Sequence, residues 1–241
     1  MIELINVNKT YGGTVKAVDN LNLTISDGEI FGFLGPNGAG KTTTIKMITG
    51  ILESDSGSIN INGIDISKNP LEAKKQFGFV PDSPDMFLRL KGIEYLNFMA
   101  DIYNISKQER EKRIQSLAEN FEMTSAIGDQ IKSYSHGMRQ KIIIMGTLIH
   151  EPPIWILDEP MTGLDPKSSF RLKQIMREYA DSGKTVFFST HVLEVAEKIC
   201  DRVAIINKGN ILFCGSLDEM KEHFKQNESL EKMFLEMIEN E

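Results

Sequence analysis

The chain has 241 residues, of which 41% are hydrophobic and 25% are charged, a balance typical of globular proteins and enough for one large domain with an insertion. The 34 acidic residues exceed the 27 Lys and Arg, and the formal net charge of -7 argues against a broad nucleic-acid-binding surface. No apolar run is long enough to cross a bilayer, and the first residues lack the basic and long apolar regions of a secretion signal. We therefore expect neither a signal peptide nor a transmembrane segment.

The N-terminal segment alternates apolar and polar residues, which predicts two antiparallel strands. Ile2 and Leu4 belong to the first strand, and a turn is expected at Tyr11-Gly12-Gly13. The apolar positions of the second strand are Leu21, Leu23 and Ile25.

A glycine-rich segment matches the phosphate-binding pattern G-x-x-x-x-G-K-[S/T]. It follows the apolar run Ile30–Leu34 and precedes a helix expected over Lys41–Ile48, which is the setting that makes this motif credible. Glycines let backbone N–H groups converge on phosphate oxygens, and the N-terminal end of the helix attracts the same anion. The residues expected to bind the nucleotide are Gly35, Pro36, Asn37, Gly38, Ala39, Gly40, Lys41, Thr42 and Thr43.

Two side chains of this segment have separate roles. Lys41 supplies a positive charge for the β- and γ-phosphates, and the Thr42 hydroxyl is an oxygen ligand of the kind that Mg²⁺ prefers. An ordinary glycine-rich turn is the alternative, and the Lys and Thr at the required spacing argue against it. The motif predicts a nucleoside triphosphate and Mg²⁺.

Short, almost entirely apolar segments predict strands that are buried on both faces of a sheet. They are Phe77–Val80, Ile154–Leu157, Thr185–Phe188 and Val203–Ile206. Helices are expected between them, including one after Pro166. One face of this helix carries Leu172, Ile175, Met176 and Tyr179. The alternation predicts an α/β fold with a mainly parallel sheet and right-handed crossovers.

The segment from about Pro84 to Ser133 lacks a strand pattern, so we expect an all-helical insertion. Within it, Lys107–Arg113 is polar and charged and indicates the solvated face of an amphipathic helix. The apolar residues of that helix are Ile114, Leu117 and Phe121. The C-terminal tail has an apolar stripe that we expect to dock on its own domain, with a partner surface as the alternative. This stripe consists of Leu230, Met233, Phe234, Met237 and Ile238.

The cysteines and histidines do not indicate a zinc site. Cys200 and Cys214 lack a metal-binding spacing, and the four histidines are scattered along the chain. We expect the two cysteines to be buried thiols rather than a disulfide.

Two acids, Asp158 and Glu159, end a predicted buried strand. In an open α/β sheet, ligands bind at the carboxyl ends of the strands. We expect Asp158 to hold Mg²⁺ opposite Thr42, and Glu159 to polarise a water molecule aimed at the γ-phosphorus. The alternative is a strand-end turn with two solvated acids, and the phosphate-binding segment elsewhere in the chain weighs against it.

Together, these motifs resemble the ATP-binding cassette (ABC) ATPase family over nearly the whole chain and in the family's order. Tyr134-Ser135-His136-Gly137-Met138 is similar to the family signature, usually Leu-Ser-Gly-Gly-Gln. Ser135 and Gly137 match the signature, and the other three positions depart from it. The resemblance implies that Ser135, Gly137 and the N-terminus of the following helix contact the γ-phosphate held by a second copy. A plain N-cap before a core helix is the alternative.

Three further segments are similar to family motifs. Ser189-Thr190-His191 resembles the segment of the switch histidine, which implies that His191 holds the γ-phosphate and orients the attacking water. Gly163-Leu164-Asp165 resembles the loop that contacts the partner subunit, and Asp165 is also a good helix N-cap before Pro166. Tyr11 stands where the family has an aromatic that stacks on adenine, whereas a turn tyrosine without a ligand is the alternative.

One departure concerns the metal. After Phe79-Val80-Pro81 the family usually has a Gln that senses Mg²⁺ and couples to the membrane partner, and this chain has Asp82. A carboxylate can also ligate Mg²⁺, although it is shorter than Gln and charged. We therefore expect Asp82 to lie near the metal.

The resemblance implies a P-loop NTPase (RecA-like) fold of class α/β, with a mainly parallel sheet, an N-terminal antiparallel β subdomain and an inserted all-helical subdomain. The chain is then one nucleotide-binding domain, 1–241. Its catalytic core is expected over residues 1–83 and 145–225, its helical signature subdomain over 84–144 and its C-terminal helix over 226–241.

The resemblance also implies a function, that of the ATP-hydrolysing subunit of an ABC membrane transporter. Two cassettes bind head to tail around ATP and Mg²⁺, with Glu159, His191 and Lys41 as catalytic residues. The partners are a second copy or a related cassette and a separate transmembrane permease at the cytoplasmic face of the membrane, which docks on the helical insertion and the region of Asp82. The tail Leu230–Glu236 resembles those of antibiotic and multidrug exporters, so we expect export.

Other functions remain possible on the sequence. A soluble ABC ATPase of cluster assembly or translation is the main alternative, although translation relatives generally carry two cassettes and DNA-repair relatives a long coiled coil. A P-loop kinase or GTPase would need an acceptor site or a guanine-reading motif, and the sequence shows neither.

Overall fold

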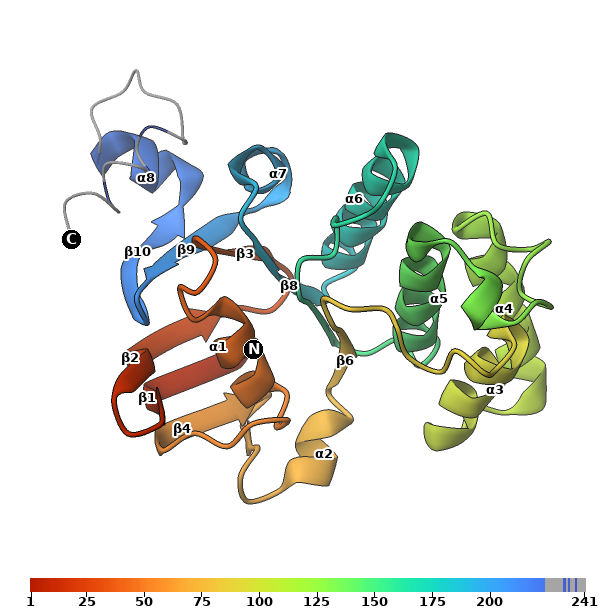
Figure 1. Cartoon of the computed structure of the whole chain (residues 1–241), viewed down its shortest axis with the longest axis horizontal. Helices are drawn as coiled ribbons and strands as arrows, with labels where there is room; N and C mark the ends of the chain where they lie inside the picture. The colour runs from red at the N-terminus through yellow and green to blue at the C-terminus, as the bar shows by residue number, and fades with distance from the viewer. Residues whose placement is uncertain (224–231, 233, 235–236, 238–241) are drawn as a thin grey trace.

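Two β-sheets form the centre of the structure (Figure 1). The structure is a computed structural model and describes residues 1–223, 232, 234 and 237. The strands are β1 (Ile2–Tyr11), β2 (Val15–Ile25), β3 (Ile30–Leu34), β4 (Ser56–Ile61), β5 (Ile64–Asp65), β6 (Phe77–Val80), β7 (Ile154–Leu157), β8 (Thr185–Thr190), β9 (Arg202–Asn207) and β10 (Asn210–Ser216). The α-helices are α1 (Lys41–Ile48), α2 (Pro70–Lys74), α3 (Gly92–Ile102), α4 (Lys107–Asn120), α5 (His136–Leu148), α6 (Pro166–Asp181), α7 (Leu193–Ile199) and α8 (Leu217–His223). A short 3-10 helix, η1, covers Ile131–Ser133.

The smaller sheet is antiparallel and has the strand order β2-β1-β4-β5. Ile2 pairs with Ile25 and Leu4 pairs with Leu23, so the two N-terminal strands predicted from the alternating residues are confirmed. We did not predict β4 and β5, because β4 has only two apolar residues and β5 is only two residues long.

The larger sheet has the order β10-β9-β3-β8-β7-β6. Its strands β9, β3, β8, β7 and β6 run parallel, which confirms the apolar strand segments and the mainly parallel sheet. β10 pairs antiparallel with β9 at the edge. We did not predict it, since its side chains are mostly half-buried and its sequence mixes apolar and polar residues.

Side chains of the larger sheet enter two different cores. Ile154 and Ile156 pack with residues of the smaller sheet and α1. Trp155 and Leu157 point to the opposite face and pack with residues of α3, α5 and α6. Because each fully buried side chain of this kind contributes about 1.5–3 kcal/mol, burial on both faces explains why these strands are almost entirely apolar.

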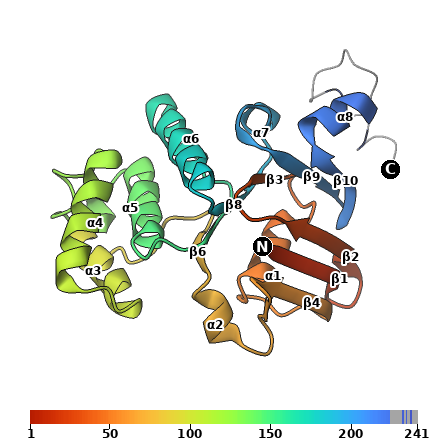
Figure 2. The same cartoon turned by 180° about the vertical axis from the view of Figure 1, so that it is seen from behind.

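The smaller sheet and the helices α3, α4 and α5 lie at opposite ends of the molecule, with β6 and β8 between them in both views (Figures 1 and 2). From residue 84 to residue 133 the elements are helical, apart from one isolated bridge between Lys91 and Gln130. The amphipathic helix after Lys107 is confirmed as α4, with Ile114 and Phe121 buried. The division of the chain into subdomains stays a prediction, and α5 extends across its expected boundary at residue 144.

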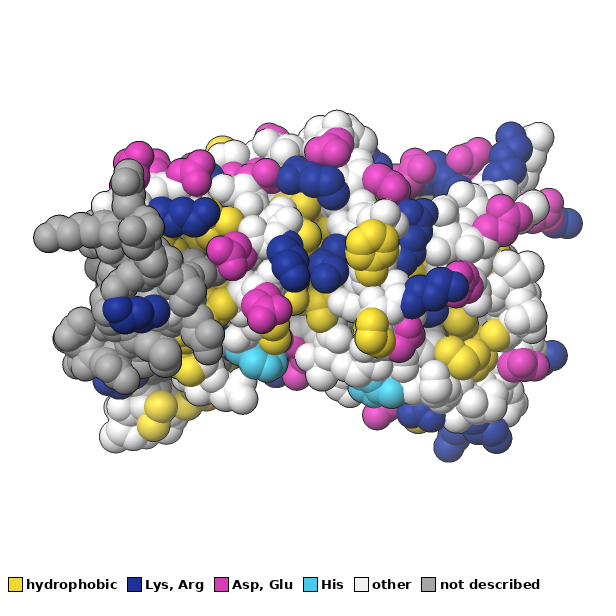
Figure 3. All heavy atoms as spheres, turned by 90° about the horizontal axis from the view of Figure 1, so that it is seen from above, with side chains coloured by type: hydrophobic (Ala, Val, Ile, Leu, Met, Phe, Trp, Pro, Cys, Tyr) yellow, Lys and Arg dark blue, Asp and Glu magenta, His cyan; other side chains and the backbone are white. Residues whose placement is uncertain are grey.

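Helix α6 confirms the helix expected after Pro166, since Leu172 and Met176 are buried. Seen from above, Lys and Arg side chains are mixed with acidic ones across this side of the molecule (Figure 3). Arg177 of this helix forms ion pairs with Asp181 and Asp201. The charged side chains of both signs are therefore interspersed rather than separated into single-sign regions.

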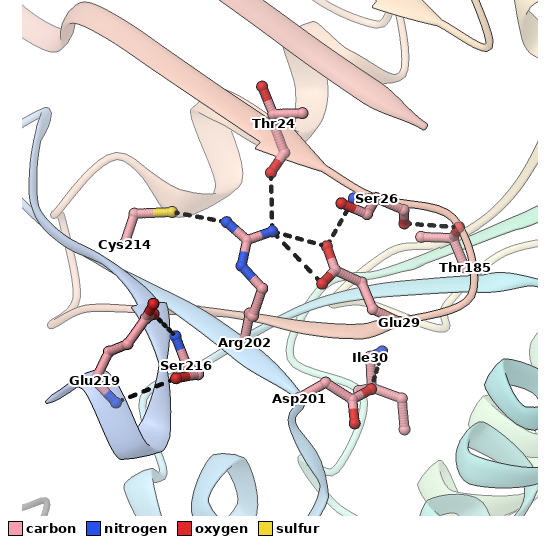
Figure 4. A network of polar contacts seen from close by, with 10 residues as sticks. All are labelled: Thr24, Ser26, Glu29, Ile30, Thr185, Asp201, Arg202, Cys214, Ser216 and Glu219. Atoms are coloured by element: carbon pink, nitrogen blue, oxygen red, sulfur yellow. Dashed lines mark hydrogen bonds and ion pairs between the residues drawn. The ribbon is translucent and has the colours of Figure 1, made fainter. Parts of the chain in front are cut away.

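A polar network connects the two sheets at the start of β9 (Figure 4). Arg202 Nη1 donates to Glu29 Oε1 (3.1 Å) and to the carbonyl oxygen of Thr24 (3.4 Å), and Nη2 donates to Cys214 Sγ (3.7 Å). Glu29 Oε1 also accepts from the backbone N–H of Ser26 at 2.6 Å. The network fixes the end of β2 against β9 and β10.

The prediction of two buried cysteines is wrong in one respect. Both cysteines are free thiols, and Cys200 is half-buried, but Cys214 is exposed. Cys214 lies on the edge strand β10, most of whose side chains are only partly buried.

Beyond α8, only Phe234 and Met237 of the predicted apolar stripe are described, and both pack against a core cluster that includes Ala196 and Met220. The other stripe residues and most of the expected helix 226–241 lie outside the described residues. In the part of the chain that the structure describes, no helix combines the length and apolarity that crossing a membrane requires.

Candidate active site

The glycine-rich segment forms a tight loop between β3 and α1. Gly38 and Gly40 have φ angles of 82° and 111°, which favour glycine. A Cβ on Gly35 would lie 2.3 Å from the carbonyl oxygen of Ile206, and one on Gly40 would lie 2.4 Å from that of Ala17. These close approaches bring the loop against β9 and β2 and fix its backbone.

The N-terminus of α1 is open to an anion. Gly40 is the N-cap and makes no side-chain hydrogen bond, and the first turn contains no acidic residue. The first N–H groups of a helix lack intrahelical partners and carry a partial positive charge, so they favour a phosphate group.

Lys41 lies at the centre of the site and is only 6% exposed. Its Nζ donates to the carbonyl oxygens of Gly35 (2.7 Å) and Pro36 (3.2 Å). It also lies 3.5 Å from Glu159 Oε1. A buried ammonium with these oxygens around it is positioned to exchange them for phosphate oxygens.

The loop borders a cavity of about 240 Å³. Its lining residues are Ala17, Pro36, Asn37, Gly38, Gly40, Lys41, Thr42, Thr43, Asp82 and Glu159. Larger cavities of about 430 and 530 Å³ lie between α4, α5 and α6 and between α3 and α4. We place the site at the smaller cavity because it alone of these three has the helix N-terminus, the lysine and the carboxylates together.

Asp158 is almost completely buried at the end of β7. Ser189 Oγ, from the neighbouring strand β8, donates to its Oδ1 at 2.5 Å. Burial raises the pKa of Asp158, repulsion by Asp82 and Glu159 adds to this rise, and hydrogen bonds from Ser189 and Thr42 oppose it. A cation at this position would favour the ionised carboxylate.

Glu159 is held by three contacts. Its backbone N–H donates to Ser189 Oγ (3.0 Å), Oε1 faces Lys41 Nζ, and Oε2 lies 3.0 Å from His191 Nδ1. Its φ angle of 48° is uncommon for a residue other than glycine and costs of order 1 kcal/mol. The surrounding contacts therefore aim this carboxylate toward the cavity.

His191 and Asp82 reach the same region from two other strands. His191 follows β8 and its side chain is 50% exposed, and Asp82 follows β6 and is exposed at the cavity. The parallel strands β3, β8, β7 and β6 are adjacent, so their carboxyl ends lie at one edge of the sheet. The structure thus brings together the predicted residues from four separate segments.

Seven predicted residues do not line this cavity. Gly35, Ala39, Asp158 and His191 adjoin or contact residues that line it, and the other three are Tyr11, Ser135 and Gly137. Tyr11 ends β1 and is 44% exposed. Ser135 is the N-cap of α5, where its Oγ accepts from the backbone N–H of Met138 (3.3 Å), and Gly137 lies in the first turn of the same helix. In a single chain, the N-terminus of α5 is separate from the phosphate loop.

Two residues of the site were not assigned a place in it from the sequence. Ser189 bridges Asp158 and Glu159. Its position at the end of an apolar strand was the sequence feature that could have placed it in the site. Ala17 lines the cavity through β2, and no local pattern indicated this.

Comparison with known proteins supports the same assignment. The sequence model of a family described as ABC transporter matches residues 18–162. The chain is 36% identical over 225 residues to the ABC transporter ATP-binding protein NatA of Bacillus subtilis (strain 168), covering 93% of this chain and 91% of the relative. It is 35% identical over 220 residues to the linearmycin resistance ATP-binding protein LnrL of the same organism, covering 91% and 70%.

Solved structures are similar over almost the whole length. The structure of an ATP-binding subunit of an ABC transporter matches with a TM-score of 0.93 and 32% sequence identity, over 98% of this chain and 99% of that chain. A dimeric ATP-binding cassette in a post-hydrolysis state, bound to ADP and Pi, matches with a TM-score of 0.81 and 27% identity, over 90% and 99%.

Proposed function

Since this chain belongs to the ABC transporter family and is an ATP-hydrolysing subunit of that family, we propose that two copies pair head to tail around ATP and drive export through a separate membrane-spanning chain. The proposal rests on one observation: the open N-terminus of α1, Lys41 and Glu159 border the same cavity.

In the proposed complex, the triphosphate lies along the loop Pro36–Thr43, where backbone N–H groups and Lys41 bind its oxygens. Tyr11 stacks on the adenine from the end of β1. Lys41 then exchanges the carbonyl oxygens of Gly35 and Pro36 for the β- and γ-phosphate oxygens.

The oxygen donors of the site fit Mg²⁺. Thr42, Asp158 and Asp82 offer a hydroxyl and two carboxylates, and a hard cation of this size prefers such ligands. When bound, Mg²⁺ would neutralise charge on the β- and γ-phosphates. The described residues contain no group of three or more His, Cys, Asp or Glu arranged as a metal site, so the nucleotide and water would have to complete the coordination.

In the proposed reaction, water attacks the γ-phosphorus and Glu159 accepts the proton that the water loses. The bond between the γ-phosphorus and the bridging oxygen breaks, and that oxygen leaves with ADP. His191 lies against Glu159 and orients the water and the γ-phosphate. Lys41 stabilises the charge that develops on the phosphate oxygens.

We assign Ser135, Gly137 and the N-terminus of α5 to the γ-phosphate of the second copy. A similar cassette was solved as a dimer with ADP and Pi, which supports pairing of two copies. ATP would join the two copies, and its hydrolysis would separate them. The helical signature subdomain of residues 84–144 would supply one side of this interface and the catalytic core the other.

The proposals of export and of a permease rest on relatives. LnrL, named for linearmycin resistance, and the similar subunit of an ABC transporter support them. The permease would place this chain at the cytoplasmic face of the membrane and dock on the helical insertion and the region of Asp82. A soluble assembly factor is the less favoured function.

Pairing and partner are tested separately. Light scattering of the purified Glu159→Gln chain, which should not hydrolyse ATP, should show a dimer with ATP and a monomer without it; a monomer under both conditions contradicts the pairing. Purification from detergent-solubilised membranes should recover a stoichiometric multispanning chain. Recovery of a soluble or ribosomal partner instead would contradict the transporter function.

A further inference from the structure

The loop between Glu159 and α6 contacts the N-terminus of α5 within the same chain. A Cβ on Gly163 would lie 2.3 Å from His136 Cδ2 and 2.6 Å from its Nε2. Gly163 also has a φ angle of 75°, in the region that favours glycine. The imidazole therefore lies directly against the Gly163 backbone, and a side chain at Gly163 would require the His136 ring to move.

The first turn of α5 also lies close to this loop. A Cβ added to Gly137 would lie 3.5 Å from the carbonyl oxygen of Gly163 and 3.7 Å from Leu164 Cδ2, so the glycine backbone faces the loop across a narrow gap. Leu164 packs against the core that α5 shares with α3 and α6. The loop therefore contacts the His136 ring and lies close to the backbone of the first turn of α5.

The same loop is tied to the catalytic glutamate proposed above. The backbone N–H of Thr162 donates to the carbonyl oxygen of Glu159 (3.1 Å), and that of Leu164 donates to Met161 (3.3 Å). These turns leave few free dihedral angles between Glu159 and Gly163. These turns connect the backbone of Glu159 to the loop that His136 contacts.

We propose that His136 is a positioning residue, whose ring fixes the N-terminus of α5 to the Gly163 loop so that Ser135 meets the γ-phosphate held by the second copy. This rests on the proposed pairing. The usual family signature has glycine at this position, and glycine could not make the contact. In this chain, a packing contact of the His136 side chain therefore holds the N-terminus of α5 in place, which a glycine at this position could not do.

The consequence is a link between the two nucleotide sites. Within one chain, the contact of the exposed His136 ring with Gly163 would hold the loop after Glu159 and the N-terminus of α5 in a fixed relation. Glu159 serves the nucleotide bound in its own chain, and Ser135 serves the nucleotide of the partner. Each chain would thereby couple the state of one site to the geometry of the other.

The contact is tested first in the nucleotide-free chain. Hydrogen exchange of the amides from 161 to 165 should be about tenfold faster in His136→Ala, the loss expected for residues in direct contact. His136→Phe keeps a flat ring and should stay within about twofold of the unmodified chain. Lys132→Ala, an exposed substitution in η1, is the matched control and should cause no change. Unchanged exchange in His136→Ala overturns the proposal.

The positioning role is tested by pairing in a Glu159→Gln background. His136→Ala should weaken ATP-dependent pairing about tenfold, His136→Phe should restore it, and the Kd of each free chain for the nucleotide should stay unchanged. Weak pairing in both variants would mean that the imidazole nitrogens act directly, and normal pairing in both would remove the role; either result overturns the proposal. If Glu159→Gln alone never pairs, the proposed function fails, and the exchange experiment still decides whether His136 holds the loop.

Discussion

His191 Nδ1 lies 3.0 Å from Glu159 Oε2, although the two residues end different strands, β8 and β7. The other carboxylate oxygen of Glu159 faces Lys41 Nζ at 3.5 Å. A single side chain thus connects a candidate water-orienting histidine with the lysine of the phosphate loop.

The first prediction concerns Glu159→Gln. The amide keeps the size of the side chain but cannot accept the proton of the attacking water, so ATP hydrolysis should fall by about 10²–10⁴ while ATP binding remains. The pair should then persist with ATP, which light scattering measures. Glu178→Gln, an exposed substitution on α6, is the control. Turnover close to that of the unmodified chain would remove Glu159 from the role of base.

The second prediction concerns Asp82. Loss of this carboxylate in Asp82→Ala should raise the Mg²⁺ concentration needed for half-maximal ATP binding and hydrolysis by about tenfold, as for other groups at the edge of a metal site. Asp82→Gln, which introduces the family's usual residue, should recover most of the affinity. A Mg²⁺ titration that superimposes on the unmodified protein for Asp82→Ala would refute the metal role.

The third prediction concerns Ser189, which is fully buried and bonded to both Asp158 and Glu159. Ser189→Ala leaves the backbone N–H of Glu159 without its acceptor, so we expect a loss of about 1–3 kcal/mol in the free energy of unfolding, measured in urea. The rate of hydrolysis should fall as well, since Glu159 is no longer held. Ser182→Ala, at an exposed serine after α6, should change neither quantity. Equal stability of the two variants would contradict the structural role of Ser189.

The fourth prediction concerns pH. The His150 ring stacks on Tyr103 with centroids 3.5 Å apart. Burial lowers the pKa of His150 to about 4. The charges of Arg113 and Lys184 lower this pKa further, and the Phe77 backbone, as an acceptor, opposes the shift. In the unfolded chain this pKa is about 6.5, so the unfolded state binds a proton first as the pH falls.

The stability that neutral His150 contributes is therefore complete above pH 6.5 and is lost as the pH falls from about 6.5 toward 4. Tm should decrease over this window, and it should decrease less in His150→Phe, which keeps a ring on Tyr103 but has no proton to gain. Parallel curves of Tm against pH for the two proteins would show that His150 does not titrate in this way.

Much of the fold was predictable because its signals are local. The alternation at Ile2 and Leu4 and the apolar run of β7 follow from which faces of each strand are buried. β4 and β10 were missed because packing against neighbours, rather than a period in their own residues, makes them strands. The exposure of Cys214 likewise depends on its place at a sheet edge.

The sequence by itself determined the phosphate loop from Gly35 to Thr43, since the spacing of glycine, lysine and threonine directly expresses the geometry of an anion site. Only the tertiary structure decided that Lys41, Glu159 and His191 meet, because the order β3-β8-β7 differs from the order along the chain. The contact of His136 with Gly163 was decided in the same way. Strand order and loop contacts arise from packing between distant segments, and no local pattern of residues records them.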